Sequence, residues 1–398
     1  MNGSGVESTR KRPSNSLSSK LSRITTTGSY IPEIDGLRFI AIMAVVAVHI
    51  AGYWLVRAGR SYPAMSPIDS ELHKVLQLGL YGVHLFFVIS GFVLAMPFCK
   101  HVFLGGKPVD LSQYFWRRVT RLEPPYVLTM LVYFLFMPFF GKGSWGELWP
   151  HLLASLAYVH NIVYGEGSLI NNVAWSLEVE IQFYLLVPLI TWLLLFRQSV
   201  RRLALIVLIL FFSLHSMWLP GHWPKSILQY AQYFLMGLML CDLWTTTWKN
   251  AGRSSLADIP GLIAWPLFIA VNVHRPGPFA DLLNPWLMAA LFFSALRGLL
   301  HGRILSCPTI TIIGGMCYSI YLLHGRVLAF VIHGALARAV HLGSFAMDYC
   351  AVAAICIPAV VAVSAVFFVV VERPCMAPNW PAEVLHLLRN ALRKSVEK

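Results

Sequence analysis

Charged residues are scarce in this sequence of 398 residues, since Asp, Glu, Lys and Arg together make up only 12% of it. Soluble domains carry about 25% charged residues. In this chain 57% of the residues are hydrophobic, and they extend over its whole length. This composition excludes a large water-soluble domain and predicts an integral membrane protein.

Paired cysteine motifs are also missing. The seven cysteines form no CxxC pair, and a cysteine in apolar surroundings usually serves as a small buried hydrophobic residue. The sequence therefore predicts neither a disulfide framework nor a metal site. The first apolar stretch begins too late and is too long for a cleaved signal peptide, so we expect it to remain as a membrane span.

Apolar stretches of about 20 residues, the length that crosses a bilayer as a helix, recur along the chain. We predict an all-α, polytopic transmembrane helical bundle of about ten spans. An amphipathic piece near 148–163 is expected to dip into the membrane without crossing it. The expected spans are 37–56, 75–98, 122–140, 179–196, 203–219, 226–244, 259–273, 282–299, 309–336 and 349–371, of which 259–273 is short and 309–336 is long enough to be tilted or broken.

The distribution of Lys and Arg predicts the orientation of the bundle. With the N-terminus inside, 22 of the 31 Lys and Arg residues lie on the inner side and seven on the outer side. We therefore expect both termini to be cytoplasmic, and we expect no nucleic-acid partner because the basic residues are scattered over short loops. The expected organisation is a disordered basic tail over 1–30, a transmembrane domain over 31–375 and a short basic amphipathic tail over 376–398, with the tails able to touch anionic lipid.

An arginine and a histidine lie within the first expected span. Arg38 and His49 are eleven positions apart, so a helix turns by about 1100° between them, and both side chains point to the same side, roughly 16 Å apart along the axis. Ionisable residues in membrane helices usually face a polar interior or a substrate path, and histidine exchanges a proton near neutral pH. The pair predicts a channel or an active site; the alternative is a lone histidine that is hydrogen-bonded inside the bundle.

Two further charged pairs flank the spans. Arg118 and Arg121 are three residues apart and share a helix face, and guanidinium groups suit phosphates, although the pair also fits an ordinary positive flank. Glu178 and Glu180 open the fourth span at its expected outer mouth. The helix dipole accounts for Glu178, whereas Glu180 is the better candidate for a buried partner of a base or of an acceptor hydroxyl.

The ninth expected span carries Tyr318, Tyr321 and His324 at three-residue steps. This spacing places them on one side of a helix, where they could line a polar cavity. Aromatic packing in the membrane core is the alternative for the tyrosines. It suits His324 less well, because Arg326 follows closely.

Six motifs in this order resemble the acyltransferase 3 family of integral-membrane acyltransferases. Together they cover roughly residues 31–375. They are D-G-L-R-x10-H at 35–49, G-V-x-L-F-F-V-I-S-G-F at 82–92, R-x-x-R-L-x-P-x-Y at 118–126, W-S-L-x-V-E-x-x-F-Y at 175–184, Y-S-I-Y-L-L-H at 318–324 and E-R-P at 372–374.

The resemblance implies an enzyme that moves an acyl group, usually acetyl, from cytoplasmic acyl-CoA to a sugar hydroxyl. In that family the acceptor belongs to lipopolysaccharide, capsule, another polysaccharide such as peptidoglycan, a Nod factor or a macrolide. By the resemblance, His49 is the catalytic base, Arg38 is a donor-site or pore residue, and Arg118 and Arg121 bind the phosphates of CoA. Acetyl-CoA or another acyl-CoA is then the donor substrate, and no metal or redox cofactor is implied.

Other motif residues complete the expected site. We place Glu180 with the catalytic groups, and Trp175, Tyr318, Tyr321 and His324 at the substrate. No Cys or Ser stands out as an acyl-carrying nucleophile, so direct transfer is the simplest mechanism. The location implied is a bacterial inner (plasma) membrane.

The chain departs from the family pattern at His84, where many members have Asp. A role for an acid at that position therefore does not carry over, although His84 could supply a different polar group. Some members also carry a C-terminal esterase-like domain, for which this sequence leaves no room. We expect the transfer to finish within the membrane, or its product to pass to a separate protein.

Two other function classes fit parts of the pattern. A proton-coupled secondary transporter or flippase of a sugar or lipid could use Arg38, His49 and Glu180 as its path. It would leave the R-x-x-R pair and the ordered motifs unexplained. A non-catalytic membrane scaffold would explain still fewer of the polar motifs.

Overall fold

The computed structural model describes residues 21–24, 30–58, 65–218, 225–248, 251–274, 277–336, 342–377 and 380–382. Over these residues the chain is helical and contains no strand, only one isolated β-bridge between Ser254 and Gly298. Most of the expected basic tail at 1–30 and the amphipathic tail beyond 382 lie outside the described residues.

The helices follow one another with short connections, and several are extended by a single turn of tighter or wider helix. Their bounds are α2 Pro32–Ala58, α3 Pro67–Gln77, α4 Tyr81–Leu104, α5 Leu111–Phe136, α6 Trp145–Leu156, α7 His160–Tyr164, α8 Trp175–Ile190, α9 Gln198–Trp218, α10 Ile227–Leu243, α11 Ile259–His274, α12 Pro278–Arg297, α13 Leu299–Leu305, α14 Pro308–Gly315, α15 Cys317–Phe330, α16 Phe345–Phe367 and α17 Arg373–Cys375.

The prediction of an all-α, multi-pass membrane protein is confirmed. Eight helical stretches in the described part of the chain are long and apolar enough to cross a bilayer, and α14 with α15 forms a ninth. That ninth stretch is bent by 71°, so the expected span 309–336 is broken. The expected span 226–244 corresponds to α10 and the turn Trp244–Trp248 that continues it, and this stretch is not among those apolar enough to cross a bilayer.

Helix α10 lies in the middle of one half of the bundle. It packs against α4, α8, α9 and α12, and twelve of its residues are buried. Its crossing with α4 is close: a Cβ atom on Gly237 would lie 2.1 Å from the carbonyl oxygen of Val88, and one on Gly91 would lie 2.1 Å from that of Phe234. Only glycine permits this backbone approach.

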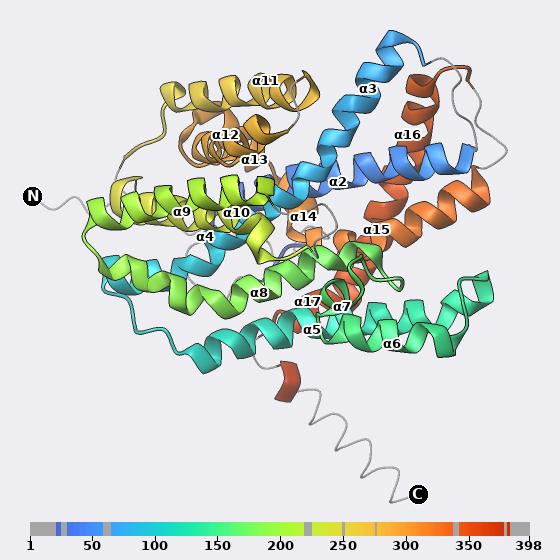
Figure 1. Ribbon diagram of the computed structural model, residues 1–398, viewed down its shortest axis with the longest axis horizontal. Helices are drawn as coiled ribbons and strands as arrows, with labels where there is room; N and C mark the ends of the chain where they lie inside the picture. Colours follow the sequence, from blue (N-terminus) through green and yellow to red (C-terminus); the bar gives the residue numbers. More distant parts are fainter. Residues whose placement is uncertain are drawn as a thin grey trace, which may run out of the picture.

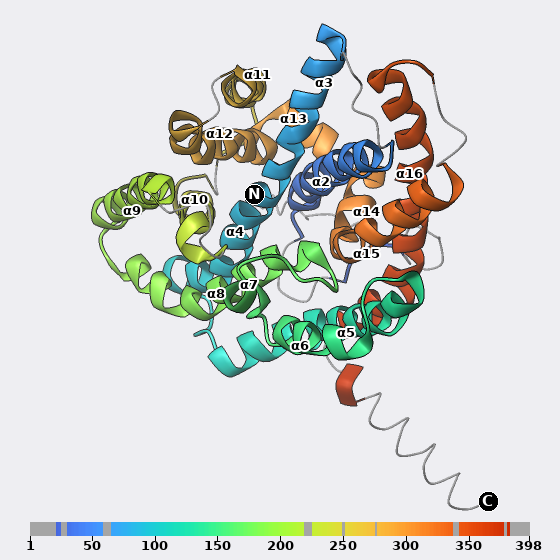
Figure 2. The same cartoon turned by 45° about the vertical axis from the view of Figure 1, so that its right-hand side comes forward.

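Helix α2 joins the two halves. It contacts α4 on one side and α14, α15 and α16 on the other, and in both ribbon views it lies between these groups (Figure 1 and Figure 2). The first expected span is therefore central, which places its polar side chains inside the protein.

The segment between α5 and α8 folds back onto the bundle. The amphipathic piece expected near 148–163 forms α6 and α7, and α6 packs along α5 (Figure 1). A capping box starts α6, in which Ser144 and Glu147 bond each other's backbone N–H groups.

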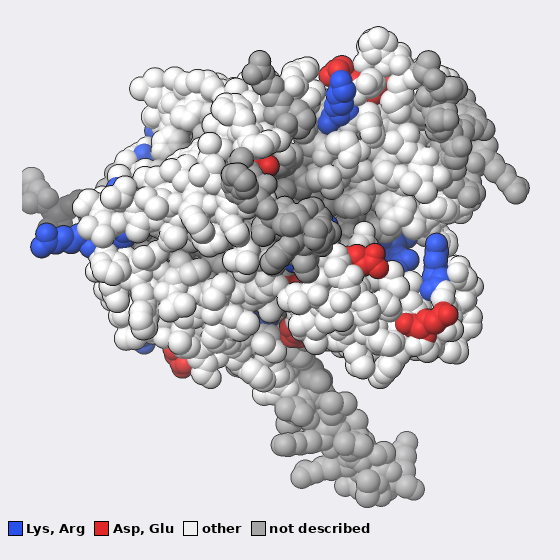
Figure 3. Space-filling view, viewed as in Figure 1, with Lys and Arg blue, Asp and Glu red and all other residues white. Residues whose placement is uncertain are grey.

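The surface agrees with a membrane setting. In the view of Figure 3 most of the face is free of charged side chains. Large apolar side chains such as Trp192 and Leu195 remain about 70% exposed, which suits contact with lipid rather than with water.

Candidate active site in two cavities

The first cavity is lined by arginines, and we call it the arginine cavity. It has a volume of about 130 Å³ and lies between α2, α4, α5, α8 and α15. Its walls include four arginines and two carboxylates: Arg23, Arg38, Arg118, Arg121, Glu180 and Glu372.

Two of these arginines share one buried carboxylate. The Nη1 atoms of Arg38 and Arg23 lie 2.6 and 3.2 Å from Oδ1 of Asp35, which is 1% exposed. The contact holds the segment Leu21–Ile24 against the start of α2. Burial, with the charges of Arg121 and Arg38, lowers the pKa of Arg23 to about 9, because a crowded cation in a poorly solvated place is disfavoured.

The other two arginines, Arg118 and Arg121, form no ion pair in the described part of the chain. Within the described residues no carboxylate lies within 4 Å of Arg118 or Arg121. The guanidinium of Arg118 lies over the rings of Tyr114 and Tyr184, 5.8 and 5.4 Å from their centres. The Nε atom of Arg121 is buried and makes no hydrogen bond. The cavity thus offers two guanidinium groups to an anionic ligand.

Glu180 lies in the arginine cavity and is not among the residues that line the pocket around His49. It accepts hydrogen bonds from Tyr184 and from the Ser90 hydroxyl, the latter at 2.6 Å. We expected it at the outer mouth of the span, beside the acceptor. The difference arises because α8 begins at Trp175 and carries Glu180 more than one turn inward, toward α4. Glu178, by contrast, accepts from the backbone N–H of Asn161 at 2.9 Å.

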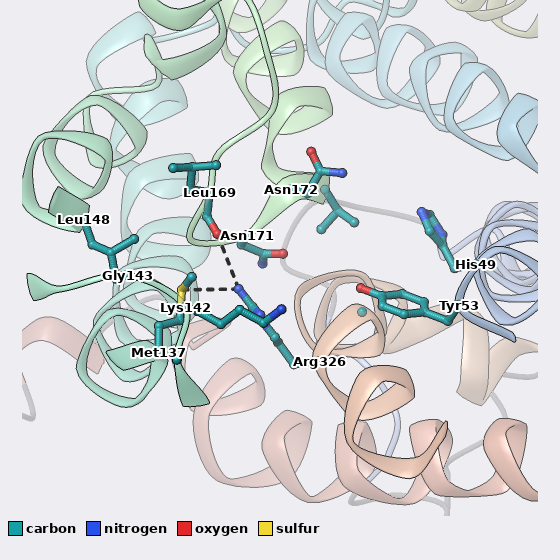
Figure 4. A pocket seen from close by; sticks show the side chains of 13 residues that line it. His49, Tyr53, Met137, Lys142, Gly143, Leu148, Leu169, Asn171, Asn172 and Arg326 are labelled. Atoms are coloured by element: carbon teal, nitrogen blue, oxygen red, sulfur yellow. Dashed lines mark hydrogen bonds between the residues drawn. The ribbon is translucent and has the colours of Figure 1, made fainter. Parts of the chain in front are cut away.

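The second cavity, the histidine pocket, lies toward the other end of α2. It has a volume of about 420 Å³, and its polar walls are formed by His49, Tyr53, Lys142, Asn171, Asn172 and Arg326. Figure 4 shows His49 and Tyr53 on one side of the pocket and Lys142 and Leu148 on the opposite side.

The hydrogen bonding of His49 fixes its tautomer. Its Nδ1 atom lies 2.8 Å from the carbonyl oxygen of Val45, one turn earlier in α2. A carbonyl only accepts, so Nδ1 carries the proton and Nε2 keeps its lone pair. A neutral imidazole with a free lone pair, in a pocket of 420 Å³, has the form that a general base requires.

A thin wall separates the two cavities. Tyr321 and Ser176 line the arginine cavity, while Val173 lines the histidine pocket. The Tyr321 hydroxyl donates to the carbonyl of Val173 and accepts from the Ser176 hydroxyl at 3.1 Å. The start of α8 and the middle of α15 therefore form the partition.

His324 lies beside His49 behind this wall. The two ring centres are 5.0 Å apart, and His324 is fully buried. Its Nδ1 atom lies 2.9 Å from the carbonyls of Ile320 and Tyr321, whereas Nε2 makes no hydrogen bond. The structure thus places two imidazole rings side by side, each with its Nδ1 atom on a backbone carbonyl.

The structure separates the predicted site residues into two groups. The arginine cavity gathers Arg38, Arg118, Arg121, Glu180, Tyr318 and Tyr321, whereas His49 opens into the histidine pocket with His324 behind it. Arg38 and His49 therefore serve different cavities.

Trp175 and His84 line neither cavity. The Trp175 ring packs against Tyr230 and under the Lys225 ammonium, which lies 4.2 Å from the ring centre. His84 is surrounded by tyrosine rings, with Tyr233 at 4.6 Å.

Sequence reasoning missed several lining residues. Arg23 lies in a Ser- and Arg-rich segment that gave no signal, and Lys142 was counted only as an outer-loop charge. Asn171 and Asn172 precede the W-S-L motif without a pattern of their own. Arg326 did carry a signal, because an arginine within a membrane span usually faces a cavity.

Comparison with known proteins gives a family and several relatives. The family described as the acyltransferase domain matches residues 31–369. The O-acetyltransferase OatA of Staphylococcus aureus (strain NCTC 8325 / PS 47) is 26% identical over 76% of this chain and 51% of its own length. The peptidoglycan O-acetyltransferase OatA of Listeria monocytogenes is 27% identical over 75% of this chain and 49% of its own length.

A third relative matches at fuller length. The acyltransferase MdmB of Streptomyces mycarofaciens is 27% identical over 87% of this chain and 92% of its own length. The present chain thus spans about half the length of the two OatA relatives and most of the length of MdmB. No solved structure matches the chain.

Proposed function

Since this chain belongs to the acyltransferase domain family, we propose that it transfers an acyl group, most simply acetyl, from acyl-CoA to a hydroxyl of a sugar-containing acceptor. Two relatives, named O-acetyltransferases, support O-acetyl transfer, and the name of one of them gives peptidoglycan, a glycan, as the acceptor. The observation that carries the proposal is the pair of cavities along α2, one cationic and one containing a free imidazole, with only a thin wall between them.

The donor belongs in the arginine cavity. Arg118 and Arg121 have no carboxylate partner among the described residues, and forked guanidinium groups suit the phosphates of CoA. Its volume of about 130 Å³ is below the range of about 300–1,000 Å³ that is usual for small-molecule sites. The thioester end of the donor therefore enters the cavity, and the nucleotide stays at its mouth beside the arginines.

The Lys and Arg bias supports the orientation. It places the N-terminal end of α2, and with it the arginine cavity, on the cytoplasmic side, where acyl-CoA is found. The histidine pocket then faces outward and receives the acceptor. The chain would act in a bacterial plasma membrane, in keeping with the bacterial sources of its relatives.

The chemistry follows from the free Nε2 of His49. This atom removes the proton of the acceptor hydroxyl as the oxygen attacks the thioester carbonyl. The C–S bond then breaks, the CoA thiolate leaves with its electron pair, and the proton on His49 passes to it. For direct transfer, the wall made by Ser176, Tyr321 and Val173 must admit the thioester, so these residues control passage between the cavities.

Reconstituted vesicles test this proposal. The protein is inserted into lipid vesicles, radiolabelled acetyl-CoA is supplied on one side and peptidoglycan sugars on the other, and acetylated sugar is measured. We expect transfer that requires both substrates and disappears in His49→Gln. Movement of sugar or protons without acetyl-CoA, with no acetylated product, would instead establish a transporter.

A further inference from the structure

All fixed charges in the histidine pocket have the same sign. Arg326 and Lys142 line it, and no Asp or Glu is among its lining residues. The arginine cavity differs, since Glu180 and Glu372 share its walls with the arginines. The positive charges of the histidine pocket are therefore not balanced by carboxylates in its wall, whereas those of the arginine cavity are partly balanced.

The guanidinium of Arg326 is only partly used by the protein. Its Nη2 atom donates to the carbonyl of Ile170 at 2.6 Å and lies 3.3 Å from the Met137 sulfur, and the group lies 5.3 Å from the centre of the Tyr133 ring. Among the residues that the structure describes, Nε and Nη1 make no hydrogen bond and no carboxylate lies within 4 Å. Half of the guanidinium fork is thus available to a ligand.

The acidic side chain beside the rim is already engaged. A Cβ atom on Gly143, which lines the pocket, would lie 3.3 Å from Oε2 of Glu147. That oxygen accepts from the backbone N–H of Ser144 at 2.7 Å in the cap of α6. Glu147 is therefore held by the helix terminus and does not reach Arg326.

Arg326 belongs to a helical stretch that is apolar enough to cross a membrane. It lies on α15, within the bent ninth stretch of the bundle. An arginine at membrane depth normally pairs with a carboxylate, with backbone carbonyls or with a ligand, and here the carbonyls satisfy only one nitrogen. Tyr53 and Asn172 add neutral polar groups to the same pocket, which suit sugar hydroxyls. Its volume of about 420 Å³ lies within the range of about 300–1,000 Å³ that is usual for small-molecule sites.

We propose that the histidine pocket selects acceptor sugars that carry an anionic group, a carboxylate or a phosphate, which Arg326 binds with Lys142 at the mouth. That the bound sugar is the acceptor of an acyl group rests on the proposed function. The preference of the pocket for anionic sugars does not depend on that function. The anion anchors the sugar on the α15 side, so that a ring hydroxyl can reach His49 across the pocket (Figure 4).

Binding without any acyl donor tests this inference separately from catalysis. Detergent-purified protein is titrated with matched sugar pairs while thermal unfolding and heat of binding are measured. The pairs are N-acetylmuramic acid against N-acetylglucosamine, methyl glucuronide against methyl glucoside, and glucose 6-phosphate against glucose. We expect the anionic member to bind about tenfold to a hundredfold more tightly, as charge-assisted hydrogen bonds do. Comparison of the carboxylate and phosphate pairs identifies the anion.

Variants locate the preference. Arg326→Gln should abolish it, Arg326→Lys should restore part of it, and Lys142→Gln, at an exposed position that folding does not need, should weaken it. Lys225→Gln, which removes a lysine outside both cavities, is the matched control and should retain it. A cooperative thermal unfolding transition of ligand-free Arg326→Gln shows that its fold is intact.

Several outcomes would overturn the inference. They are an equal response to both members of every pair, including no binding of either, and a preference that survives Arg326→Gln. If instead the preference is found and depends on Arg326, while acetyl-CoA neither binds nor reacts, the acyl-transfer proposal fails and the anion-selective pocket stands.

Discussion

Replacing both Arg118 and Arg121 with glutamine should abolish the response of the protein to acetyl-CoA without lowering its own stability. The reason is that neither guanidinium forms an ion pair: no carboxylate of the described residues lies within 4 Å of either one, so the double variant breaks no salt bridge. Arg38 is the contrasting case, because its Nη1 atom lies 2.6 Å from the buried carboxylate of Asp35.

The expected magnitudes differ accordingly. Acetyl-CoA at a hundredfold excess over its Kd should stabilise the wild type by about 2.7 kcal/mol. A charged hydrogen bond contributes about 1.5–3 kcal/mol, so losing two should weaken binding at least a hundredfold, and the same concentration would then stabilise by about 0.4 kcal/mol or less. Arg38→Gln should cost about 3 kcal/mol in the unliganded protein, the low end for breaking a buried pair, because Arg23 still contacts Asp35.

Thermal unfolding in detergent, with and without acetyl-CoA, measures both quantities in the same samples. A double Arg118→Gln/Arg121→Gln variant that unfolds earlier than the wild type without ligand would show that these arginines hold the fold together. A double variant that keeps the full acetyl-CoA shift would place the donor elsewhere. Either result would refute the prediction that Arg118 and Arg121 bind the donor and do not stabilise the fold.

Three further predictions follow from particular contacts. His49→Gln should lower acyl transfer by about 10²-fold or more at unchanged unfolding temperature, and an active, inserted variant would remove His49 from the mechanism. Tyr321→Phe removes the donor to the Val173 carbonyl and should lower unfolding stability by about 1 kcal/mol; no change would mean that this bond does not hold the wall. Gly237→Ala would force a Cβ atom to 2.1 Å from the backbone of α4 and should cost about 1–3 kcal/mol. Gly52→Ala, with nothing within 4 Å, is its control, and equal unfolding temperatures for the two would contradict the close crossing.

On the proposed mechanism, the partition between the two cavities must open for the thioester to reach His49. A thioester held by the arginine cavity reaches His49 only past Tyr321 and Ser176. The hydroxyls of both residues are already bonded to each other and to the Val173 carbonyl. Joining the cavities therefore requires these hydrogen bonds between α15 and the start of α8 to break. The break between α14 and α15, bent by 71°, adjoins this wall in the chain.

The fold class and most of the spans were predictable because hydropathy acts locally. A run of about 20 apolar residues must satisfy its backbone hydrogen bonds within itself in a bilayer, so the sequence of 398 residues was enough to predict an all-α, multi-pass protein. The same reasoning could not predict that α10, with 17 residues, lies enclosed by four other helices. That follows from glycine contacts such as Gly91 and Gly237, which involve residues far apart in the chain.

The sequence was also enough to identify candidate site residues. Arg38 and His49 lie on one side of a helix within an apolar span, and Arg118 and Arg121 lie one helical turn apart. Only the tertiary structure decided how they are shared between cavities. Helix periodicity fixes the direction of a side chain relative to its own axis, but which neighbouring helix it meets depends on packing. This packing puts Glu180 with the arginines, His324 against His49, and Arg326 in the histidine pocket.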